Sequence, residues 1–131
     1  MSLPALLDQR LRLPLVAAPM FLVSNPPLVS ACCNSGIVGS FPALNQRESA
    51  GFAAWLDEIE GSLASNAAPY AVNLIVHNSN PRLQADLAIC IEHRVPIVIT
   101  SLGAREDVNQ AVHGWGGVVL HDIINNKFAH K

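Results

Sequence analysis

The sequence predicts an α/β fold of about five β/α units, the N-terminal part of a TIM-type (β/α)8 barrel. Five short apolar runs, at residues 13–20, 36–41, 70–76, 95–100 and 117–121, alternate with segments of helical spacing. Near-continuous apolar runs are typical of parallel strands that are buried on both faces. Half of the 131 residues are apolar and only 14% are charged, which excludes a mainly disordered chain.

The segments between these runs carry helix signals. Ser24 or Asn25 can cap a helix that has Pro26 or Pro27 in its first turn and ends at Gly36. The segment 45–61 predicts a second helix, because its apolar residues recur at helical spacing: Phe52, Trp55, Leu56 and Ile59.

Three further helices are expected along the rest of the chain. A third helix should start at Asn80-Pro81 and place three apolar side chains on one face: Leu83, Leu87 and Ile91. Residues 104–113 predict a shorter helix, and a last one begins near Asn125.

Right-handed crossovers leave two topologies for this alternation, an open doubly wound sheet or part of a barrel. A doubly wound nucleotide-binding fold should carry a glycine-rich loop after its first strand, where this chain has Ala18-Pro19-Met20-Phe21. The sequence therefore favours the barrel. A complete barrel takes about 250 residues, so we expect residues 1–131 to form one incomplete barrel domain. Its two unpaired sheet edges favour a homo-oligomer.

The composition and charge of the chain limit which binding partners and cellular locations are expected. A net charge of −2 argues against binding to nucleic acid or an anionic membrane. No apolar run approaches the roughly 20 residues that span a bilayer, and charged residues interrupt the N-terminus where a signal peptide would be apolar. Three cysteines without a CxxC motif indicate a reducing, cytoplasmic location. We expect all three to be unreactive core residues: Cys32, Cys33 and Cys90.

Candidate site residues lie where the strands end, because α/β folds bind ligands at the carboxyl ends of their strands. Asn73 stands inside an apolar strand, and its buried carboxamide must find hydrogen-bond partners. It either binds a ligand or ties neighbouring strands together. The pair His121-Asp122 ends the last strand, but adjacent strand residues point to opposite faces. We therefore expect no metal site.

Four segments in order resemble the nitronate monooxygenases, formerly called 2-nitropropane dioxygenases: residues 16–20, 36–40, 70–74 and 118–125. The resemblance covers essentially the whole chain. It implies a (β/α)8 barrel that binds FMN non-covalently and oxidises a small-molecule alkyl nitronate with O2. Related FMN barrels share some of these segments, among them flavin-type enoyl reductases and inosine-monophosphate dehydrogenase.

The resemblance also implies site residues. Ala18, Pro19 and Met20 would pass under the flavin ring, Asn73 would hydrogen-bond FMN, and His121 would line the pocket. Some relatives have a lysine after this histidine, where this chain has Asp122. The family's catalytic histidine and phosphate-binding loops correspond to positions beyond residue 131, so no catalytic residue is assigned. The chain is therefore expected to be the N-terminal part of such an enzyme.

Two hypotheses of different classes follow. The first is an FMN-dependent oxidoreductase, and the second is a non-catalytic half-barrel that self-associates through its open edges. Flavin bound to the purified chain distinguishes them.

Overall fold

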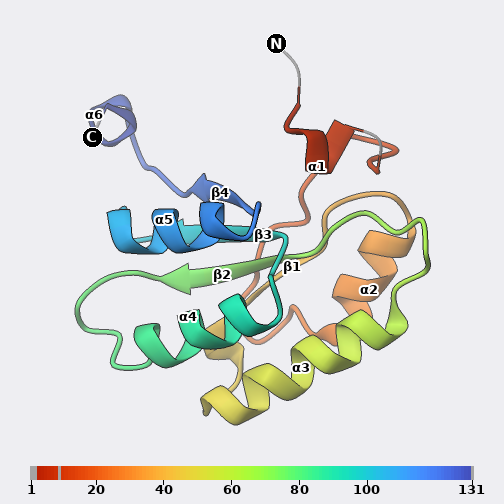
Figure 1. The fold of residues 1–131 in the computed structure, drawn as a ribbon, viewed down its shortest axis with the longest axis horizontal. Helices are drawn as coiled ribbons and strands as arrows, with labels where there is room; N and C mark the ends of the chain where they lie inside the picture. Colours follow the sequence, from red (N-terminus) through yellow and green to blue (C-terminus); the bar gives the residue numbers. More distant parts are fainter. Residues whose placement is uncertain (1–2, 9, 131) are drawn as a thin grey trace.

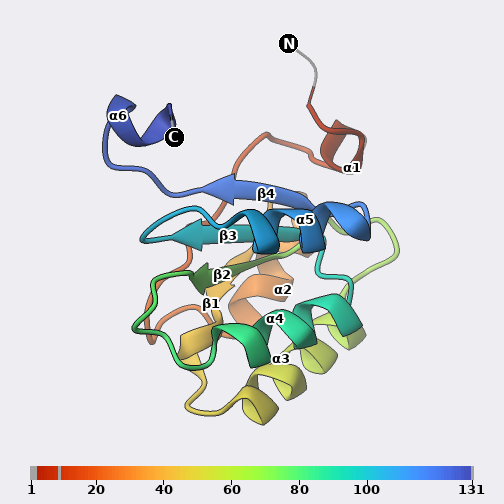
Figure 2. The same cartoon turned by 60° about the vertical axis from the view of Figure 1, so that its left-hand side comes forward.

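The structure, a computed structural model, describes residues 3–8 and 10–130. Its sheet has four parallel strands in sequential order: β1 (Ser40–Pro42), β2 (Ala71–Ile75), β3 (Ile97–Ser101) and β4 (Val118–His121). Figure 1 shows β2 and β4 pointing in the same direction, and Figure 2 shows the arrows of β2, β3 and β4 side by side with their carboxyl ends at one edge. The register places Asn73 opposite Ile99, and Thr100 opposite His121.

One face of the sheet is covered by helices, as Figure 2 shows. These are α2 (Pro26–Asn34), α3 (Ser49–Ser62), α4 (Leu83–Glu92) and α5 (Glu106–Gly114). Their buried apolar side chains join those of the strands in one core cluster, which includes Phe41, Phe52, Val72 and Val98. A short 3-10 helix, η1 (Ala43–Asn45), follows β1, and α6 (Asn126–Ala129) follows β4.

The opposite face carries a smaller apolar cluster of Leu7, Val38, Ala71, Ile97 and Ile99. Leu7 belongs to α1 (Ala5–Asp8), which Figure 2 shows near the amino ends of the strands. A doubly wound sheet reverses its strand order and carries helices on both faces. Here the order is sequential and α2–α5 all pack on one face. Sequential parallel strands with all these helices on one face are the arrangement of a (β/α)8 barrel. The face with Ile97 and Ile99 corresponds to the barrel interior.

The first expected strand, residues 13–20, is only partly formed. It contributes one isolated parallel bridge, Val16 with Val38, supported by a 2.8 Å bond from the Ala17 amide to the Val38 carbonyl. Pro19 is the next position after Ala17 whose N–H would face β1, and it has none to donate, which explains why the ladder does not extend in that direction. This segment therefore lies beside β1 as an extended edge.

The helix starts are close to their expected positions. Asn25 caps α2 by accepting a 3.0 Å hydrogen bond from the Leu28 amide. The third expected helix begins later than Asn80-Pro81, at Leu83. Asn80 closes the preceding turn instead, since its side chain donates to the Ile75 carbonyl and accepts from the Arg82 amide. Among the described residues, no helix is both long and apolar enough to cross a membrane.

Candidate functional site

Asn73 lies in β2 and is only 6% exposed. Its Nδ2 donates to Oγ of Ser101 at 2.7 Å and to the Ile99 carbonyl at 3.0 Å. The amide therefore ties β2 to β3, as the structural alternative predicted. Within the described part of the chain, its hydrogen bonds use Nδ2 alone, which leaves the acceptor Oδ1 for a ligand.

Ser101 extends this polar row to the end of β4. Its hydroxyl accepts from Asn73 and donates to Oδ2 of Asp122 at 3.3 Å. The Asp122 amide donates to the Thr100 carbonyl at 2.9 Å, which holds this residue against the sheet. The sequence analysis did not single out Ser101 as a site residue, although it shares the two-residue period of Ile97 and Ile99 and therefore their face.

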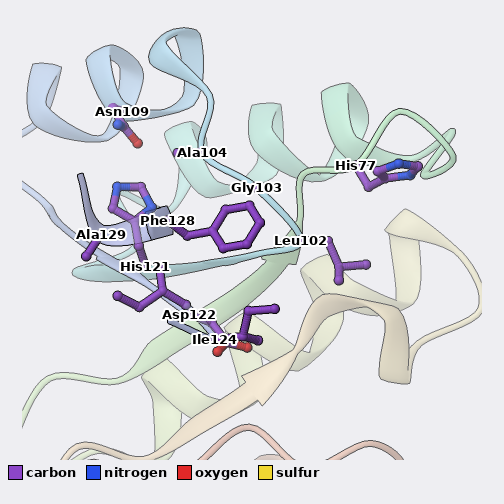
Figure 3. A pocket seen from close by; sticks show the side chains of 11 residues that line it. His77, Leu102, Gly103, Ala104, Asn109, His121, Asp122, Ile124, Phe128 and Ala129 are labelled. Carbon is purple, nitrogen blue, oxygen red and sulfur yellow. The ribbon is translucent and has the colours of Figure 1, made fainter. Parts of the chain in front are cut away.

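His121 lies on the other side of β4. Its Nδ1 is 2.5 Å from Oγ1 of Thr100, the buried residue opposite it in β3. Figure 3 shows the His121 ring and the Asp122 carboxylate directed away from each other, as strand alternation predicts. The structure thus brings Asn73, Ser101 and Asp122 together and places His121 on the helix-covered face.

An open cleft of about 1080 Å³ lies at the carboxyl edge of the sheet (Figure 3). His121 and Asp122 line it together with the loop after β3, where Leu102 is exposed. Asn109 of α5 also lines it, and its buried Oδ1 has no hydrogen-bond partner among the described residues. No local pattern in the sequence pointed to Asn109, because its exposure to the cleft depends on how α5 packs.

Ala18, Pro19 and Met20 follow the isolated bridge at the edge of the sheet beyond β1. Ala18 and Met20 are exposed, and Pro19 is half-buried. The Met20 amide donates to Oγ of Ser24 at 2.9 Å, so the chain turns here towards α2. The small and apolar residues expected beneath a flat ring are therefore accessible to a ligand.

The residues at this edge fit the ring of a flavin better than its phosphate. They supply an amide acceptor on Asn73, the Ser101 hydroxyl, and accessible apolar surface at Ala18 and Met20. These four residues do not line the cleft itself, which adjoins them through Asp122. Among the described residues that line the cleft there is no lysine or arginine to hold a phosphate group. The arrangement can hold a planar heterocycle by its edge.

A second polar cluster lies near the end of α3. Ligand atoms of Asp57, Glu60 and His93 lie within 4.8 Å of one another, and the Tyr70 hydroxyl donates to Glu60 at 2.6 Å. Oε2 of Glu60 lies 3.3 Å from Nδ1 of His93. Because Asp57 and Glu60 are exposed, ordinary surface pairing accounts for this group.

No protein-family model matches this chain, and no curated protein matches its sequence. Its fold is similar to that of FabK from Thermotoga maritima, with a TM-score of 0.81, 20% identity, and coverage of 95% of this chain and 38% of that chain. The M276A mutant of the same protein gives a TM-score of 0.80 at 20% identity, with 95% and 40% coverage. The chain thus spans about two fifths of the length of these relatives. Its fold is a partial α/β barrel, as the sequence predicted.

Proposed function

We propose that this chain is the flavin-ring-binding part of an FMN-dependent oxidoreductase. The observation that carries this proposal is the buried Asn73 amide, two residues before the carboxyl end of β2 in a barrel-type sheet, with an Oδ1 that no described residue binds. Ligands of barrels bind at the carboxyl ends of the strands. The resemblance of the four sequence segments to nitronate monooxygenases and the fold likeness to FabK both support it.

The roles of the residues follow from their chemistry. Oδ1 of Asn73 accepts a hydrogen bond from the ring edge, and Ala18, Pro19 and Met20 give the ring an apolar support. His121 lines the cleft from the other face of β4. When bound, FMN supplies the electron transfer, while the protein orients the ring and excludes water.

The first substrate class is the small alkyl nitronate, oxidised with O2, which the sequence resemblance supports. A flavin-type enoyl reductase is the second candidate, and the likeness to FabK supports it equally well. Asp122 bears on this choice, because a carboxylate at the cleft disfavours an anionic nitronate more than a neutral enoyl group.

Flavin titration of the purified 131-residue chain tests the proposal. We expect FMN and riboflavin to bind with similar affinity, because the described cleft residues hold no cation for the phosphate. Quenching of flavin fluorescence and a perturbed visible absorption band report the binding. A chain that binds neither flavin contradicts the proposal and supports the alternative, a non-catalytic half-barrel.

That alternative rests on exposed apolar residues at the two sheet edges. Leu13, Leu15 and Val16 are exposed at the first edge, and Ile123 and Ile124 follow β4 at the other. Unpaired parallel edges with apolar side chains favour association with another copy of the chain.

A further inference from the structure

The side chain of Asn45, at the end of η1, holds a loop that lies more than 20 residues earlier in the sequence. Its Nδ2 donates to the Ser24 carbonyl at 2.8 Å and to the Met20 carbonyl at 3.2 Å. Its Oδ1 accepts from the Leu22 amide at 3.0 Å. One carboxamide thus satisfies three backbone groups of the 20–24 loop.

The loop needs such support because its backbone is unfavourable for its residues. Leu22 has φ of 60°, in the left-handed region, which a leucine adopts only when its surroundings enforce it. The side chains of residues 20–23 are 42–76% exposed, so little burial holds them in place. The loop is therefore fixed through its backbone while its apolar side chains face outward.

The residue after Asn45 is in turn held by Arg82, which precedes α4. The Arg82 guanidinium donates to the carbonyl of Gln46, the residue after Asn45, and to Oδ1 of Asp86 at 2.9 Å. Asp86 is fully buried and also accepts from the Ser49 hydroxyl at 2.6 Å. Hydrogen bonds from Arg82 and Asp86 therefore fix the backbone directly after Asn45, and the Asn45 side chain binds the loop that contains Met20.

We propose that Asn45 is a positioning residue that holds the 20–24 loop so that Met20 supports the flavin ring. The inference rests on the proposed function, and Asn45 itself touches no ligand in it. The loop is presented in one conformation before the ligand arrives, which reduces the ordering cost of binding.

The test combines amide hydrogen exchange by NMR with flavin titration. In Asn45→Ala, we expect the Leu22 amide to exchange at least about tenfold faster and the riboflavin dissociation constant to rise about fivefold, the loss expected from one neutral hydrogen bond. The visible band of the bound flavin should also lose its fine structure. Asn45→Asp keeps the acceptor for the Leu22 amide but places a carboxylate against the carbonyl oxygens of Met20 and Ser24. The Leu22 amide should therefore remain protected from exchange, while riboflavin binding should still weaken.

A matched control is Asn66→Ala, which changes an exposed residue in the turn before β2 and should alter none of these readouts. The amides of Val72 and Val98 report global unfolding. The inference is overturned if they accelerate as much as Leu22, or if the Leu22 amide is unaffected by Asn45→Ala. It is also overturned if flavin affinity is unchanged in Asn45→Ala while Asn73→Leu weakens it, a result that leaves the proposed function standing. A wild-type chain that binds no flavin contradicts both.

Discussion

Nδ2 of Asn73 on β2 donates to Oγ of Ser101 on β3 across 2.7 Å, on the sheet face that carries Ile97 and Ile99. Ser101 then donates to Asp122, so a polar row runs from the middle of β2 to the ends of β3 and β4. In the partial barrel this row lies at the carboxyl edge of the interior face. The amide therefore has two functions, tying strands together and leaving an acceptor for a ligand.

Replacing Asn73 with leucine should weaken both functions. The dissociation constant for riboflavin should rise about fivefold, and the free energy of unfolding should fall by about 1–3 kcal/mol because buried polar groups lose a partner. Ser101→Ala leaves the Asn73 amide held by the Ile99 carbonyl alone and should weaken flavin binding to a smaller extent. The matched control is Asn66→Ala, an exposed position that should change neither stability nor flavin affinity. Unchanged flavin affinity in folded Asn73→Leu would remove Asn73 from the site.

Gly39 allows α2 to approach the sheet closely. An added Cβ would lie 2.4 Å from the Val29 carbonyl oxygen and 2.9 Å from its Cα, both backbone atoms of α2. Gly39→Ala should therefore destabilise the fold by about 1–3 kcal/mol, measured by denaturant unfolding. Gly61→Ala, where no atom lies within 4 Å, should be neutral or stabilising. Equal stability of the two variants would contradict the close approach of Val29 in α2 to Gly39.

The cysteines should differ in reactivity. Burial raises the pKa of the Cys33 thiol, and burial likewise raises the pKa of Cys90, so both react slowly at neutral pH. Cys32 is half-buried, which corrects the expectation that all three cysteines are core residues. It precedes the buried Cys33 in α2, so its side chain points in a different direction from the helix axis. Peptide mapping after brief alkylation of native protein should find Cys32 labelled first. Labelling of Cys90 at the same rate would contradict the packing of α4.

The exposed first edge gives a test of self-association. Val16 is 41% exposed beside β1, and a lysine on an edge strand opposes pairing with another chain. Light scattering should show concentration-dependent association of the wild type and a shift towards monomer in Val16→Lys. A wild type that is monomeric at all concentrations would refute the association proposal.

Features encoded by neighbouring residues were predictable. Asn25 before two prolines correctly predicted the start of α2, and the apolar runs predicted β2, β3 and β4. Pro19 was visible too, but its effect on the first strand required knowing the partner of that strand. The two-residue period could place Ser101 on the face of Ile97 and Ile99, but its bond to Asn73 and the role of Asn45 depend on contacts with residues more than 20 positions away.

The most direct test of flavin binding at Asn73 is an NMR titration of the labelled chain with riboflavin. The account predicts that the side-chain amide of Asn73 and the backbone amides of Ser101 and Asp122 shift together and saturate with the same dissociation constant. Shifts confined to the cluster around Glu60 and His93, with the Asn73 amide unchanged at saturation, would contradict it.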